Sequence, residues 1–257
     1  MTVYVVALNT FREAVRDRVL YNLVLFALLM MAAAILVGQI SLDIEQIVIV
    51  NLGLSAISII GLFISVFMGV GLVYKEMEKR TLYALLAKPV RRWEFLLGKY
   101  AGLLLTLVVN TAAMATGLFL VLLYVKHSLD RGDAYLLVAV YFILLKLALV
   151  VALALLFSCF TTPFLAILFT SGIYVAGLFA TELRTLQGPK LSHAMAVFLR
   201  WLSYVLPNFE NFNVMALVAH GKAIPRAMMV HNTLYAVVYC GVVLAAASVI
   251  FARRNLK

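Results

Sequence analysis

Long uninterrupted runs of apolar residues constrain this chain more than any other feature of its sequence. Six runs approach or exceed the roughly 20 residues that a helix needs to cross the hydrocarbon core of a bilayer. They extend over Leu20–Val37, Ile47–Val73, Leu96–Val125, Ala134–Phe157, Phe164–Ala180 and Leu234–Phe251. The sequence therefore predicts an all-α integral membrane protein with six transmembrane helices.

The composition supports this fold class. The chain has 257 residues, of which 65% are hydrophobic and 12% charged, whereas a soluble domain carries about 25% charged residues. No stretch between the apolar runs has the size of a soluble domain, so residues 1–257 are expected to form a single transmembrane domain. The formal net charge of +10 does not indicate nucleic-acid binding, because the basic residues lie beside the membrane spans, where they determine topology.

The distribution of Lys and Arg predicts the orientation in the membrane. With a cytoplasmic N-terminus, thirteen of the 21 basic residues face the cytoplasm, seven lie outside, and Lys146 falls within the fourth span. Both termini are then cytoplasmic. The long connection Thr181–Thr233 becomes external, and it is too polar to span the membrane. We expect it to form re-entrant or surface-lying helices.

A short charged stretch, Lys75–Lys99, interrupts the apolar sequence with seven basic and three acidic residues. This stretch is the only substantial cytoplasmic loop of the predicted topology. Its leucines, Leu82, Leu85 and Leu86, share one side of a short helix that Pro89 should end. Topology explains the basic residues after Pro89, but it does not explain leucines between cations. An apolar ridge with a charged rim is typical of a helix that docks into a groove on a soluble partner.

Three motifs in and after this stretch carry a family resemblance: EKRTL at 78–82, LLAKPVRR at 85–92 and FLLGK at 95–99. They resemble the E-x-G-T-L…L-L-A-x-P-V-S-R…L-G-K signature of ABC-2-type export permeases. The likeness includes an amphipathic N-terminal segment with Arg12 and Arg16 and the external sequence YVLPNF at 204–209, so it covers nearly the whole chain. Arg80, where the family often has Gly, and Arg91, where a small residue is common, make the loop more basic than usual.

The resemblance implies the permease subunit of an ATP-binding-cassette exporter, similar to permeases of nitrous-oxide-reductase maturation and of multidrug and lipid export. It implies a location in a bacterial or archaeal plasma membrane and an N-terminal interfacial helix. The charged loop would form a coupling helix in a cleft of a separate ATPase subunit. Contacts to that ATPase are expected at Arg12, Arg16, Glu78, Arg80, Thr81, Leu82, Leu85, Leu86, Pro89 and Arg92. Two permease subunits are expected to pair as a homodimer, with membrane lipids and an external partner protein as further partners. The external loop contains Pro207, Asn208 and Phe209.

The sequence indicates no catalytic site and no cofactor of its own. A phosphate-binding P-loop needs G-x-x-x-x-G-K-[ST], and the pairs Gly98-Lys99 and Gly221-Lys222 lack the upstream glycine and the following hydroxyl. No Ser/His/Asp grouping or intramembrane carboxylate pair is visible. We therefore expect ATP and Mg²⁺ to bind the partner subunit.

Two features within the spans have structural and functional interpretations. An ionised Lys146 near the middle of a span costs roughly 2.5–3.5 kcal/mol, so it either pairs with a polar group on a neighbouring helix or lines a translocation path. The second span carries a stripe of small residues that lets helices approach closely. It packs either within the chain or at a dimer interface. Its members are Ser58, Gly61, Ser65 and Gly69.

The histidines give a weaker signal. His127, His193, His220 and His231 all fall on the predicted external side or at its membrane edge, and two of them have methionine neighbours. Imidazole and thioether groups together suit copper. However, ten methionines in an apolar chain make such neighbours frequent, so no metal site is expected.

Two other function classes remain at this stage. The first is a membrane anchor or assembly scaffold that recruits a soluble partner without moving a substrate. The second is a secondary transporter, which typically places several ionisable groups at mid-membrane on broken helices. Lys146 alone meets that description, so the exporter permease is favoured. The residues do not choose among lipids, hydrophobic compounds and polysaccharides as substrates.

Overall fold

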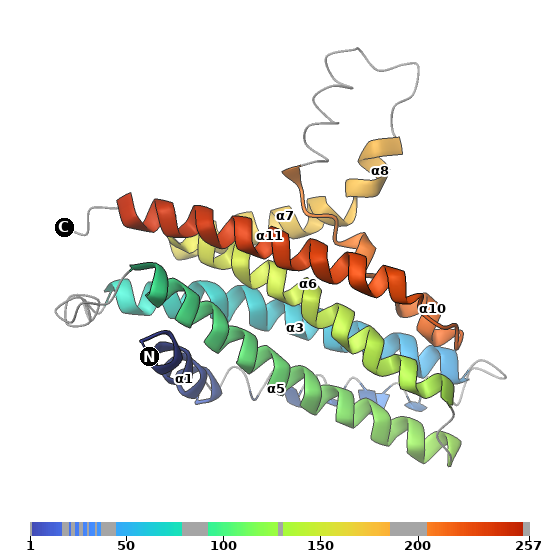
Figure 1. Ribbon diagram of the computed structural model, residues 1–257. Coiled ribbons are helices and arrows are strands. Elements are labelled where there is room, and N and C mark those ends of the chain that lie inside the picture. Colours follow the sequence, from blue (N-terminus) through green and yellow to red (C-terminus); the bar gives the residue numbers. More distant parts are fainter. Residues whose placement is uncertain are drawn as a thin grey trace.

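The computed structural model describes residues 2–16, 45–78, 92–127, 131–185 and 205–253, with isolated helical positions between 21 and 36. The regular structure in these residues is helical (Figure 1). Its elements are α1 (Thr2–Val15), α3 (Glu45–Glu78), α5 (Arg92–Lys126), η1 (Arg131–Ala134), α6 (Tyr135–Ser158), α7 (Pro163–Leu178), α8 (Ala180–Thr185), η2 (Glu210–Phe212), α10 (Met215–Ala219) and α11 (Arg226–Arg253).

Four of the described helices, α3, α5, α6 and α11, are long and apolar enough to cross a membrane. They correspond to the second, third, fourth and sixth predicted spans. The fifth predicted span is a shorter apolar helix, α7, whose 16 residues extend about 24 Å. Within the first predicted span, Leu20–Val37, the structure describes only separate helical positions between 21 and 36. The chain is thus an all-helical protein with four long candidate spans and one shorter apolar helix, and the count of six stays a prediction.

The start of α11 differs most from the sequence expectation. The helix begins at Arg226, two turns before the predicted Leu234. The apolar run placed the start too late because the first turns of the helix carry polar residues. These polar groups are satisfied locally. The Asn232 side chain donates to the Asn211 carbonyl at 2.8 Å, and the Thr233 hydroxyl donates to the Met229 carbonyl at 2.6 Å. A helix tolerates polar side chains whose hydrogen bonds are made within the structure.

Helix α6 occupies the centre of the bundle. It packs against α3, α5, α7 and α11 (Figure 1), and most of its residues are buried. The contact with α3 is close because glycines lie at the crossing. A Cβ atom on Gly61 would stand 2.5 Å from a Leu147 methyl carbon, and one on Gly69 would stand 2.9 Å from the Ala154 Cβ. Small residues at such crossings let backbones approach and are typical of helix pairs in lipid.

Helix α1 also packs closely along the first turns of α5, because glycines lie at this crossing. A Cβ atom on Gly98 would lie 2.6 Å from the Val6 Cβ, and one on Gly102 would lie 2.5 Å from the Ala7 carbonyl oxygen. Thr10 and Ala14 of α1 are fully buried, whereas Arg12 and Arg16 are exposed. Helix α1 is therefore amphipathic, with its apolar face fixed to α5.

Different helix termini lie at the two ends of the bundle. Helix α1, the end of α3, the start of α5 and the end of α11 lie together at one end (Figure 1). Helix α10, the start of α11, the start of α6 and the end of α5 lie at the opposite end. We call the first of these the loop end, because the two helices that flank residues 79–91 meet there.

Candidate functional site

Part of the predicted ATPase contact surface lies within the described structure, at the loop end. Arg12 in the last turn of α1 and Arg16, directly after the helix, are both exposed. Glu78 is the last residue of α3, and Arg92 is the first residue of α5. The remaining predicted contacts lie outside the described residues: Arg80, Thr81, Leu82, Leu85, Leu86 and Pro89.

The first turns of α5 are fixed to two other helices. The Lys99 side chain is only 1% exposed, and its ammonium lies 3.7 Å from a carboxylate oxygen of Glu13 on α1. The same ammonium lies 5.8 Å from the centre of the Phe95 ring. Phe95 in turn stacks on Phe251 of α11, with ring centres 6.1 Å apart. A displacement of the start of α5 would therefore be transmitted to α1 and to the end of α11.

A buried polar cluster lies deeper in the bundle, around Lys146 of α6. This side chain is 5% exposed, and its ammonium donates a hydrogen bond to the Ser58 hydroxyl of α3 at 2.6 Å. It also lies 6.0 Å from the centre of the Tyr174 ring of α7. The Glu210 carboxylate interacts electrostatically with both Lys146 and Tyr174. Three helices thus meet at one ammonium group.

The small-residue stripe of α3 faces the interior of the chain. Ser58 holds Lys146, while Gly61 and Gly69 contact α6 directly. Ser65 is buried and donates to the Gly61 carbonyl at 2.7 Å. The role of this small-residue stripe in dimer packing stays a prediction.

The Pro207–Phe209 segment of the predicted external loop is buried against the bundle. The backbone N–H of Phe209 donates to the Gly177 carbonyl at 3.2 Å, and its ring packs on Tyr174 with centres 5.0 Å apart. Asn208 donates its backbone N–H to the Tyr235 hydroxyl at 3.0 Å and accepts the N–H of Glu210 at 3.1 Å. This segment therefore connects α7 and α11, and it brings Glu210 toward the Lys146 cluster.

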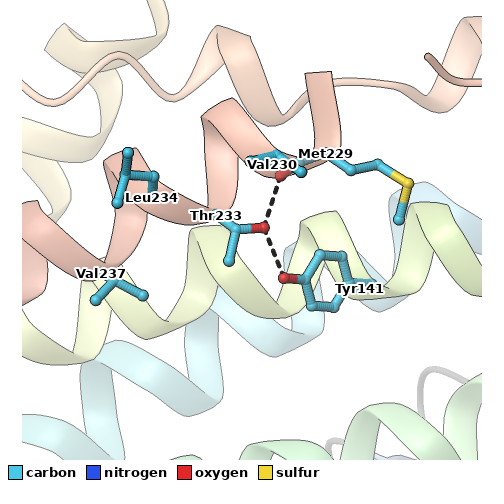
Figure 2. Close-up of a pocket in the computed structure, with 6 residues that line it drawn as sticks. All are labelled: Tyr141, Met229, Val230, Thr233, Leu234 and Val237. Carbon is cyan, nitrogen blue, oxygen red and sulfur yellow. Dashed lines mark hydrogen bonds between the residues drawn. The ribbon is translucent and has the colours of Figure 1, made fainter. Parts of the chain in front are cut away.

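A hollow of about 540 Å³ lies between α6 and α11. It is lined by Tyr141, Met229, Val230, Thr233, Leu234 and Val237 (Figure 2). The Tyr141 and Thr233 hydroxyls are 2.7 Å apart, and Thr233 also donates to the Met229 carbonyl, as Figure 2 shows. We call this hollow the α6–α11 groove.

Sequence reasoning missed Ser58 as the partner of Lys146, and it missed Tyr174, Glu210 and the α6–α11 groove entirely. Ser58 was singled out only as a small residue, and 88 positions separate it from Lys146. A lysine at mid-span does signal that a polar partner is needed, but it does not say on which helix. Of the histidines, His127, His220 and His231 lie in described parts, and His193 does not. Among the described residues, no group of three His, Cys, Asp or Glu side chains is arranged to hold a metal ion.

Four long apolar helices and a lysine held inside the bundle are typical of a multi-pass membrane protein. Residues 4–256 match the family model described as ABC-2 family transporter protein, so the chain belongs to that family. It is a permease, the membrane component of an ABC exporter. ABC-2 permeases have no catalytic activity and bind no cofactor, and they pair with an ABC ATPase that is a separate subunit. Comparison with curated proteins returned no match.

The Lys146–Ser58 hydrogen bond yields a test by paired substitutions. Ser58→Ala would leave the buried ammonium without its hydroxyl acceptor and should destabilise the protein by about 1–3 kcal/mol. Lys146→Met removes the charge together with its burial cost, so it should destabilise less. In the Lys146→Met background, Ser58→Ala should have almost no further effect. Thermal unfolding in detergent measures all three, with a shift of about 2–4 °C for each kcal/mol.

Ser248→Ala on α11 serves as the control, because the Ser248 hydroxyl bonds only to its own helix, at the Ala245 carbonyl. This variant should melt with the unmodified protein. Equal losses from Ser58→Ala with and without Lys146 would show that the two side chains are not coupled.

Proposed function

We propose that this permease pairs with its ATPase subunit through residues 75–99, and that ATP-driven closure of the ATPase moves the helices attached to that segment. The observation that supports this proposal is the arrangement at the loop end. The end of α3 at Glu78 and the start of α5 at Arg92 lie there beside the exposed basic face of α1. A partner that binds the segment between these two helices therefore acts on both at once.

Two sets of contacts give the movement a route into the bundle. At the loop end, α1 follows α5 because Gly98, Gly102 and the Lys99–Glu13 pair hold the two helices together. Deeper in the bundle, α3 is connected to α6 through Ser58 and Lys146. The nucleotide state can drive this change only if it favours one arrangement of the helices over the other.

We further propose that the loop end faces the cytoplasm of a bacterial or archaeal cell, with both termini on that side. Helix α1, which has Arg12 in its last turn, and the end of α11, whose last residue is Arg253, both lie at this end, as expected for cytoplasmic flanks of membrane helices. Residues 1–257 form one transmembrane domain in this proposal, and α1 lies at the membrane surface.

Two copies pair as a homodimer, as in the nitrous-oxide-reductase maturation and multidrug or lipid export permeases that the loop motifs resemble. The face of α3 with Ser58, Gly61, Ser65 and Gly69 packs against α6 within one copy, so the homodimer contact is proposed elsewhere on the bundle. The loop around Pro207, Asn208 and Phe209 faces the exterior in this proposal.

Lys146 is our candidate for a group that contacts substrate on its way through the bundle. A buried ammonium that joins three helices changes its surroundings whenever these helices move relative to one another. Such a group suits a passing anionic or polar substrate moiety, because the charge is already desolvated and interacts strongly with a counter-charge.

The docking segment is tested by Leu85→Asp. A carboxylate placed on the apolar ridge should prevent it from entering an apolar groove, so the ATPase should no longer co-purify with the permease. Insertion into the membrane should be unaffected. Ala223→Asp, in the exposed connection before α11 at the opposite end of the bundle, is the control and should retain the ATPase. Normal recovery of ATPase with Leu85→Asp would contradict the proposal.

The role of Lys146 is tested in proteoliposomes that contain the permease and its ATPase. Lys146→Met should abolish export and substrate-stimulated ATP hydrolysis, while basal hydrolysis and the melting temperature stay close to normal. Export that is unchanged in this variant would show that Lys146 has a structural role only.

A further inference from the structure

The α6–α11 groove lies open at the outer surface of the bundle. Val230, Leu234 and Val237 are each more than half exposed, and they recur at helical spacing along one face of α11. Tyr141, Met229 and Thr233 lie deeper and are partly buried. The groove volume of about 540 Å³ falls within the range of roughly 300–1,000 Å³ that is usual for small-molecule sites.

The groove offers almost no unsatisfied polar group to an occupant. Its two hydroxyls bond to each other and to the Met229 carbonyl (Figure 2). Its other lining side chains are apolar. A polar occupant would lose hydrogen bonds to water without replacement, whereas an alkyl chain loses none. The groove is therefore suited to a hydrocarbon chain.

A cation stands where such a chain would reach the membrane surface. Arg226 is the first residue of α11, one turn before Val230 on the face that lines the groove, and it is exposed. It forms no ion pair with any acidic side chain in the described part of the chain. Helix α11 has 28 residues and extends about 42 Å. The hydrocarbon core is only about 30 Å thick, so its terminal residues Arg226 and Arg253 reach opposite headgroup layers.

We propose that the α6–α11 groove binds an anionic phospholipid, with one acyl chain between α6 and α11 and the headgroup phosphate at Arg226. The apolar walls recognise the chain, and the guanidinium, which bonds phosphate through two parallel N–H groups, recognises the charge. Lys222, exposed four residues earlier, adds a second positive charge near the same end of α11. In this proposal, α11 makes a lipid contact that is separate from the ATPase contact at the loop end.

Native mass spectrometry of the purified full-length permease with its ATPase tests the site directly. Titration with phosphatidylglycerol should give a retained lipid adduct, and phosphatidylcholine of the same chain length should bind more weakly. Val237→Trp, which fills the groove, should remove this adduct, and Val230→Trp should do so independently. Arg226→Gln should reduce the preference for phosphatidylglycerol about fivefold, as expected for the loss of one surface cation.

Two variants on the same helix control for general effects. Val249→Trp adds the same bulk at an exposed position outside the groove, and Arg253→Gln removes an arginine at the opposite end of α11. Both should retain the adduct and its lipid preference. Binding that survives both tryptophan variants would overturn the proposal, and so would equal binding of the two lipids by the unmodified protein. A disulfide between Val237→Cys residues of two permease copies would show that a second copy occupies the groove instead.

Discussion

The ammonium of Lys146 is the group whose burial the rest of the bundle has to accommodate. An unpaired charge inside a membrane helix is costly, so the helices around it have to supply a polar acceptor at close range. Ser58 supplies it from α3 at 2.6 Å, which fixes the relative position of α3 and α6. The Tyr174 ring of α7 adds a further contact, with its centre 6.0 Å from the ammonium. The most central helix is thereby connected to elements from distant parts of the sequence.

The two close crossings in the structure suggest how an exporter permease transmits movement. Glycines bring α1 against the start of α5 and bring α3 against α6, so each pair has little room to slide independently. Helix α3 ends and helix α5 begins at the loop end, where the ATPase is proposed to bind. A movement of the residues between α3 and α5 would then be transmitted to the interior of the bundle through α3 and to its periphery through α1. The family membership defines the protein as the membrane half of an ABC exporter, and these contacts supply a physical route for the coupling.

The sequence predicted the features that depend on local composition. Apolar runs located α3, α5 and α6 to within a few residues, and the motifs around Pro89 indicated the family. The start of α11 was predicted late because Asn232 and Thr233 are polar, and their hydrogen-bond partners become visible only in the fold. Helix α7 ends at Leu178, two residues before the predicted end, and a separate helix begins at Ala180. The partner of Lys146 and the α6–α11 groove depend on which helices pack together, and a single sequence does not specify that.

The claim that ATP-driven closure of the ATPase moves the helices attached to residues 75–99 can be tested with spin labels. Tyr74 of α3 and Val249 of α11 are exposed near the loop end, and the native Cys159 and Cys240 are buried, so cysteines at 74 and 249 can be labelled selectively. The labelled permease would be diluted with unlabelled copies, so that most complexes carry one labelled pair. The account predicts that the distance between the labels changes when the ATPase passes from the nucleotide-free to the ATP-trapped state, and that Leu85→Asp abolishes the change. A distance distribution that is identical in both nucleotide states of the intact complex would contradict it.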